Sequence, residues 1–224
     1  MAYALDFNKI ELGQYLEELT QKELLPSRSA LKFGLEKRFT QISRQGIRNL
    51  QDLRAVLKTK KRLEDFATRS GVNMEYLILL AREINSMEAR PVKLREFPNV
   101  DMTSVHALES IGIDSSEQLF NASTTKERRE HLIDVTGIKP SQLDELVRLS
   151  DLVRIQWVGT AFARILWLAH VDTVEKVASS DEQELYQKIG SVMERSYIGI
   201  AKLGMKDAKR CIHAARQLTY DIQY

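Results

Sequence analysis

The spacing of apolar residues along the chain predicts helices from end to end. Several segments carry leucines three or four positions apart, which places them on one face of a helix: Leu12, Leu16 and Leu19; Leu77 and Leu80; Leu143 and Leu146. No segment has the strict apolar–polar alternation that is typical of a half-buried strand. The sequence therefore predicts an all-α protein.

The chain also repeats itself. Residues 46–82 align without a gap with residues 112–148, at an offset of 66, and ten of the 37 aligned pairs are identical. Ordinary residue usage would give roughly two identities by chance. A third, altered copy follows near residue 169, at an offset of 58. Repeats of this length predict tandem helical units that pack on their neighbours.

Signals for helix ends recur at matching places in each copy. Gly46 and Gly112 each end an apolar helical run, and a second glycine follows 25 residues later, at Gly71 and Gly137. A glycine after the last helical residue accommodates a left-handed backbone conformation, so we expect helices to end at these positions. Helix N-caps are predicted at Asn49, Ser115 and Thr173, and Ser115 has the spacing of a capping box with Gln118. In the third copy the closing turn is predicted at Gly204, and His170 takes the position of Gly112.

These signals divide the chain into four parts. We expect an N-terminal helix in residues 1–24, a first repeat in 25–90, a second in 91–150 and a third in 151–224. In the third repeat the two turns lie 34 residues apart instead of 25. The surplus predicts an insertion near residues 186–200.

Composition is consistent with a folded, cytoplasmic protein. Glycine and proline are scarce, and Cys211 is the single cysteine, so no intrachain disulfide can form. The N-terminus lacks the features of a signal peptide. The most apolar stretch, residues 155–171, contains an arginine and is too short to cross a bilayer comfortably, so no membrane role is expected.

Positive charge gathers in the first repeat. Residues 31–90 carry 13 Lys and Arg against 7 Asp and Glu, whereas residues 91–150 carry 7 against 10. Arg54, Lys58 and Arg62 lie four positions apart, within the densest basic run of the chain. Lys60 and Arg62 recur in the second repeat, which favours a helix cap or a salt bridge common to both copies. Lys58 and Lys61 do not recur, and this makes them the sharper functional candidates.

The turns resemble the helix-hairpin-helix motif, most clearly where Val158-Gly159 joins two helical segments ahead of Val171-Asp172-Thr173. Trp157 stands where the motif usually has its first glycine. As a whole the chain resembles a bacterial family of unknown function built from tandem degenerate helix-hairpin-helix units. The resemblance implies sequence-independent contact with nucleic-acid phosphates through backbone N–H groups at a helix N-terminus.

Two groups of candidate residues follow. The hairpin group is Arg154, Val158, Gly159, Thr160 and Arg164, and the basic group is Lys58, Lys60, Lys61 and Arg62. The alternative for the first group is an ordinary packed αα-hairpin, and for the second a solvated helix face or loop. Phosphate binding at a joint site requires both groups to lie on one positive surface.

Catalysis finds little support in the sequence. The four histidines are scattered without metal-ligand spacing, and Cys211 lies among alanines in the last helical segment. We expect no enzyme activity, no metal and no cofactor. The leading hypothesis is a non-catalytic nucleic-acid-binding module, with DNA or RNA as partner. The alternative is a protein-interaction scaffold, and the sequence leaves the oligomeric state open.

Overall fold

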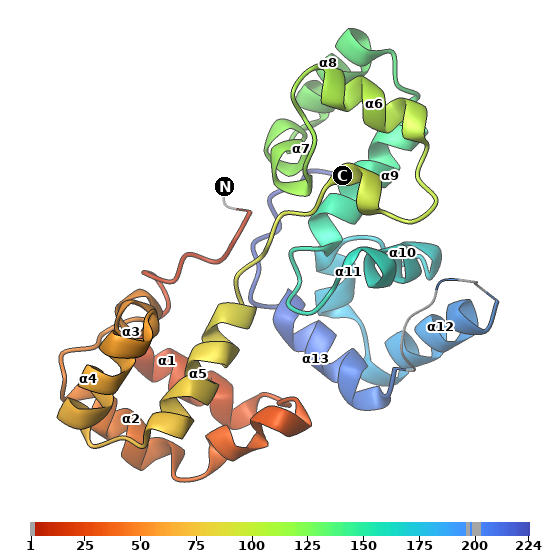
Figure 1. Ribbon diagram of the computed structural model, residues 1–224. Helices are drawn as coiled ribbons and strands as arrows, with labels where there is room; N and C mark the ends of the chain where they lie inside the picture. The colour runs from red at the N-terminus through yellow and green to blue at the C-terminus, as the bar shows by residue number, and fades with distance from the viewer. Residues whose placement is uncertain (1–2, 196–197, 199–202) are drawn as a thin grey trace. The chain divides into compact units, whose positions relative to one another are not determined.

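The computed structural model describes residues 3–195, 198 and 203–224, and it confirms the predicted all-α class (Figure 1). The chain forms two compact units, which are described separately below. The N-terminal unit is Leu5–Glu88, and the C-terminal unit is Ala89–Tyr224 together with Tyr3 and Ala4.

The N-terminal unit packs its helices around leucine and aromatic side chains. Leu53, Phe66, Leu77 and Leu80 are fully buried where helices α3, α4 and α5 meet. The first helix packs against α2. The elements of this unit are α1 (Leu12–Gln21), the 3₁₀ helix η1 (Pro26–Lys32), α2 (Leu35–Ser43), α3 (Leu50–Leu57), α4 (Lys60–Ser70) and α5 (Met74–Ser86).

The first helix is shorter than the predicted range of residues 1–24. It begins at Leu12 because the segment before it is extended and pairs with the chain at the start of α3. The Leu12 N–H donates to the Arg48 carbonyl at 2.8 Å, and the Leu50 N–H donates to the Ile10 carbonyl at 3.0 Å. These two bonds hold residues 10–12 in an extended conformation that a helix would not allow.

The C-terminal unit is organised around a long central helix, α9, which contacts α7, α8 and α10. Helices α11 and α12 both pack against α13. The predicted insertion near 186–200 falls partly in α12 and partly outside the described residues. The elements are η2 (Leu94–Glu96), α6 (Met102–Ser110), α7 (Ser116–Ala122), α8 (Lys126–Thr136), α9 (Pro140–Leu152), α10 (Thr160–Leu168), α11 (Val174–Ser179), α12 (Glu182–Arg195) and α13 (Met205–Ala215).

The sequence offset of 66 also relates helix positions in the two units. Helices α4 and α8 begin and end 66 residues apart, as do α5 and α9, and α3 and α7 begin 66 residues apart. An isolated antiparallel bridge joins Glu11 to Asn49 in one unit and Lys93 to Ser115 in the other. Positions in α3–α5 can therefore be compared with their counterparts in α7–α9. The likeness to helix-hairpin-helix units stays a prediction.

Most of the predicted helix ends are confirmed. Asn49 and Thr173 cap their helices, and Ser115 forms a capping box with Gln118. The four turn glycines of the first two repeats all have positive φ, between 69° and 85°. His170 also has a positive φ, of 58°, at the position that matches Gly112. The prediction for Gly204 is wrong, because its φ is −110° and it precedes α13 instead of ending a helix.

The C-terminal unit closes around the buried guanidinium group of Arg154. Its Nε donates to the Tyr3 carbonyl at 2.9 Å, and its Nη2 donates to the Thr219 carbonyl at 3.0 Å. Its Nη1 forms an ion pair with Asp151 at 2.5 Å, and the group lies 4.3 Å from the centre of the Phe120 ring. One side chain thus joins segments from both ends of the chain to the end of α9.

Replacing Arg154 by methionine is expected to lower the free energy of unfolding by about 3–5 kcal/mol, because it leaves the buried Asp151 carboxylate without its cation. The adjacent change Asp151→Asn should restore part of this loss by removing the unpaired charge. Urea unfolding followed by tryptophan fluorescence measures the effect, since both tryptophans, Trp157 and Trp167, belong to this unit. Lys188→Met at an exposed site is the control, and a loss below about 1 kcal/mol for Arg154→Met would contradict the central role of this group.

Candidate nucleic-acid interface

Three cations of the N-terminal unit line a single surface hollow of about 300 Å³. Arg54 comes from α3, Lys58 from the residue that ends α3, and Arg62 from the first turn of α4. Their spacing of four residues keeps them on one side although the chain turns between the two helices. We call this site the basic hollow; its lining consists of Gln51, Arg54, Ala55, Lys58, Arg62 and Asn85.

Each cation of the basic hollow is held differently. Arg54 forms an ion pair with Glu88 and lies 5.4 Å from the centre of the Phe7 ring. Arg62 donates to the Ala55 carbonyl at 3.3 Å, which anchors it to the end of α3. The Lys58 side chain is exposed and makes no ion pair with any described residue. The lining therefore presents three positive charges, with the carboxylate of Glu88 paired to one of them.

The recurring basic residues have the structural role that their repetition suggested. Arg62 donates to the last turn of the preceding helix, and its counterpart Arg128 donates to the Asn121 carbonyl at 2.8 Å. Lys60 forms an exposed ion pair with Glu64 at 3.9 Å, and Lys126 forms the equivalent pair with Glu130. The predicted helix-cap and salt-bridge roles are confirmed for these residues. Such exposed pairs contribute little to stability.

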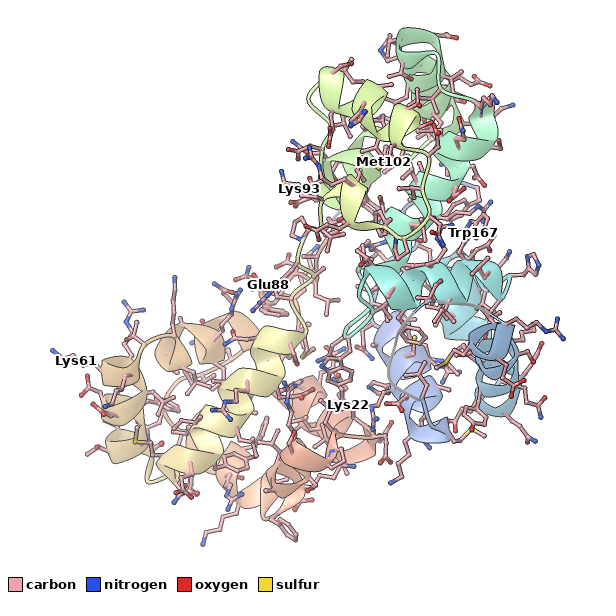
Figure 2. The ribbon with its side chains drawn as sticks, turned by 45° about the vertical axis from the view of Figure 1, so that its right-hand side comes forward. Lys22, Lys61, Glu88, Lys93, Met102 and Trp167 are labelled. Atoms are coloured by element: carbon pink, nitrogen blue, oxygen red, sulfur yellow. The ribbon has the colours of Figure 1, made fainter. Side chains whose placement is uncertain are left out.

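Lys61 lies beside the basic hollow in sequence but does not line it. Its side chain is exposed, and Figure 2 shows it extending outward from α4. It makes no ion pair with any described residue. Lys58 and Lys61, the two basic residues that do not recur, are thus the ones whose charge no described carboxylate neutralises.

The hairpin group has a different environment, at the turn between α9 and α10. Val158 is buried, Gly159 is exposed at the N-cap of α10, and Thr160 begins the helix. Gly159 offers no side-chain cap, and the first N–H groups of a helix lack acceptors within it. Trp157 has a φ of 67°, an uncommon value for a bulky residue. The backbone at this turn retains donors suited to an anion.

The predicted phosphate contacts by Arg154 and Arg164 are wrong. Arg154 is 2% exposed and is occupied by the internal bonds described above. Arg164 is 3% exposed, donates to the Pro98 carbonyl at 2.7 Å and pairs with Glu145 at 2.6 Å. Both guanidinium groups satisfy buried acceptors of the C-terminal unit, so neither reaches a phosphate outside it.

The two groups of candidates belong to different compact units. Lys58, Lys60, Lys61 and Arg62 are in the N-terminal unit, and the α9–α10 turn is in the C-terminal unit. A joint surface therefore stays a prediction. The sequence reasoning did not select Gln51, Arg54 or Asn85 as site residues. The spacing of Arg54 from Lys58 was the available signal, whereas no sequence pattern indicated the two amides.

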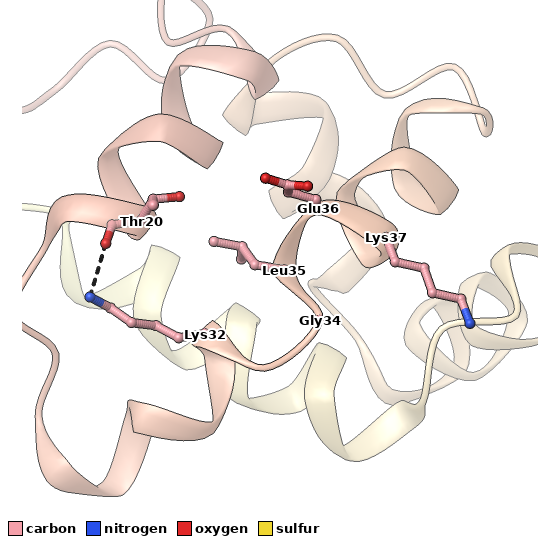
Figure 3. Close-up of a pocket in the computed structure, with 6 residues that line it drawn as sticks. All are labelled: Thr20, Lys32, Gly34, Leu35, Glu36 and Lys37. Atoms are coloured by element: carbon pink, nitrogen blue, oxygen red, sulfur yellow. Dashed lines mark hydrogen bonds between the residues drawn. The ribbon is translucent and has the colours of Figure 1, made fainter.

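A second hollow of about 420 Å³ in the same unit is less suited to an anion. It lies where α1, η1 and α2 meet, and Figure 3 shows the Lys32 ammonium donating to the Thr20 carbonyl, at 3.1 Å. The Lys37 side chain extends away from that pair, and Glu36 adds a negative charge to the lining (Figure 3). Its charges are mixed and dispersed, so the basic hollow is the better candidate.

Residues suited to catalysis or to membrane insertion were also considered. Burial raises the pKa of the Cys211 thiol to about 12. Among the residues that the structure describes, no group of three or more His, Cys, Asp or Glu side chains could hold a metal ion. Within those same residues, no helix has both the length and the apolar character needed to cross a membrane.

Cys211 is expected to resist alkylation in the folded protein. A thiol with a pKa of about 12 is almost entirely protonated at pH 8, and the residue is buried in α13. Iodoacetamide at pH 8 should leave the native protein unmodified by mass spectrometry and should modify one site in guanidinium chloride. Complete alkylation of the native protein within minutes would contradict this burial.

Comparisons with known proteins bear on the C-terminal unit. The family model described as "Domain of unknown function (DUF4332)" matches residues 99–218, which is more than half of the chain. No curated protein and no solved structure matches the chain. The basic hollow lies outside the matched residues.

Proposed function

Since this chain belongs to the DUF4332 family of domains of unknown function, we propose a function from its geometry: non-catalytic binding of nucleic acid through backbone phosphates at the basic hollow. The observation that carries the proposal is the convergence of Arg54, Lys58 and Arg62 on one hollow. Lys61 adds a further exposed charge on the first turn of α4.

The chemistry of these side chains suits a phosphodiester. A guanidinium group presents several N–H donors in a plane and matches two oxygens of one phosphate, and a lysine ammonium supplies a compact charge. Arg62 is held by its bond to the Ala55 carbonyl, so part of its conformational freedom is already lost before a ligand binds. Contacts to phosphates carry no base information, and binding of this kind is independent of sequence.

Salt dependence distinguishes this function from apolar recognition. If the four cations each neutralise one phosphate, log K should fall with log[salt] with a slope of about −3 for a single strand and about −3.6 for a duplex. Between 50 and 200 mM salt this corresponds to a loss of affinity of about 50- to 150-fold. A protein-interaction scaffold that binds through apolar contacts predicts no such slope.

Reversing the two unneutralised charges tests the proposal. In the variant Lys58→Glu with Lys61→Glu we expect affinity for labelled oligonucleotides to fall by about tenfold or more at 50 mM salt, with a shallower salt slope. Fluorescence anisotropy of labelled DNA and RNA, single-stranded and duplex, measures both quantities. The matched control is Lys9→Glu with Lys37→Glu, which makes the same charge change at exposed sites of the same unit outside the hollow.

The control should bind within about twofold of the unchanged protein, since its phosphate contacts remain. Equal losses in both double variants would reduce the effect to net charge and would contradict a site at the hollow. The absence of any binding at low salt would reject the nucleic-acid function and leave the interaction scaffold.

A further inference from the structure

The counterpart of the basic hollow in the C-terminal unit is covered by other segments of the chain. At an offset of 66, Lys58 corresponds to Thr124 and Asn85 to Asp151. The Gln223 N–H donates to the Thr124 carbonyl at 2.9 Å, and the Tyr224 hydroxyl donates to the Asp151 carboxylate at 3.0 Å. This face of three helices thus holds a single extended chain segment, residues 219–224.

A second segment covers the rest of that counterpart face. The position of Arg54 is taken by Phe120, and the Tyr3 ring packs edge-on against it with 5.5 Å between ring centres. The Tyr3 hydroxyl also forms a hydrogen bond with Ser116 at 2.7 Å. In the N-terminal unit Phe7 lies beside Arg54 in a similar way, but Lys58 and Asn85 remain exposed.

The lining of the basic hollow differs from its counterpart mainly in charge. Ala55 corresponds to a neutral Asn121, and Arg62 to an arginine, Arg128. At each of the other four positions the hollow is one charge more positive, so its formal charge is +3 where the counterpart has −1: Gln51 for Glu117, Arg54 for Phe120, Lys58 for Thr124 and Asn85 for Asp151. The same helical face is therefore built once for a nearly neutral peptide segment and once for an anion.

We propose that the basic hollow binds one extended strand of nucleic acid, so that the protein prefers single-stranded over duplex ligands. This rests on the proposed function and names its substrate class. The counterpart face supplies the precedent for one extended polymer, and the four charge differences select a polyanion. A nucleic-acid strand carries one negative charge per nucleotide, a denser charge than an ordinary peptide has.

The side-chain amides of the hollow favour an unpaired strand as well. Gln51 and Asn85 both carry a donor and an acceptor, and Asn85 is held within 3.4 Å of the Arg54 Nε. Base edges and sugars that a duplex hides are open to such groups in a single strand. A concave site of about 300 Å³ also admits one strand more readily than the convex surface of a double helix.

The test gives the hollow two residues of its counterpart. In Lys58→Thr with Asn85→Asp, both exposed positions take the identities found at Thr124 and Asp151. The matched control is Lys37→Thr with Asn73→Asp, which makes the same charge change elsewhere in the unit and keeps a capping side chain on α5. Anisotropy at fixed salt compares a labelled single-stranded oligonucleotide, its duplex and a polyglutamate peptide of equal charge.

For the unchanged protein we expect single-strand binding to exceed duplex binding by about tenfold, and we expect the hollow variant, but not the control, to lose about tenfold of it. Duplex binding that is equal or tighter, and is lost in the hollow variant, would overturn the single-strand preference while leaving phosphate binding intact. No binding of either nucleic acid at low salt would reject both proposals. Binding of polyglutamate that exceeds both would likewise reject them and assign the hollow to an acidic protein partner.

Discussion

The buried guanidinium of Arg154 is the interaction on which the C-terminal unit depends. A charged group taken out of water must be paired and hydrogen-bonded, and Asp151 with the carbonyls of Tyr3 and Thr219 meets that demand. Satisfying it fixes two chain segments that are 216 residues apart in sequence, and with them the Tyr3 ring and residues 219–224. The same constraint explains why a basic residue next to a helix-hairpin-helix-like turn is unable to serve a phosphate.

The N-terminal unit uses the same arrangement of three helices without that closure. Position 85 is an amide instead of a carboxylate, and position 54 is an arginine instead of an aromatic residue. No buried acid therefore needs a cation from inside, and the arginine remains at the surface, where it joins Lys58 and Arg62 around one hollow. Closure of one face and exposure of the other follow from a few differences in charge, on helices whose bounds match at an offset of 66.

Local features of the fold could be predicted from the sequence because neighbouring residues determine them. Glycines at left-handed positions such as Gly71, the capping box at Ser115 and the helix-end role of Arg62 all involve residues within a few positions of one another. Burial could not be read in this way. The partners of Arg154 and Arg164 lie up to 151 residues away in sequence, so nothing adjacent indicated that both arginines face inward. Gln51 and Asn85 were missed for the same reason, since α3 and α5 meet only after folding.

The account places the ligand on the N-terminal unit, at the hollow that its counterpart face keeps closed. The most direct test is a titration of ¹⁵N-labelled protein with a short single-stranded oligonucleotide, followed by heteronuclear NMR. We expect chemical-shift changes at the backbone of Lys58 and Arg62 and at the side-chain amides of Gln51 and Asn85. Shifts confined to the α9–α10 turn around Gly159, with the hollow unchanged, would contradict the account.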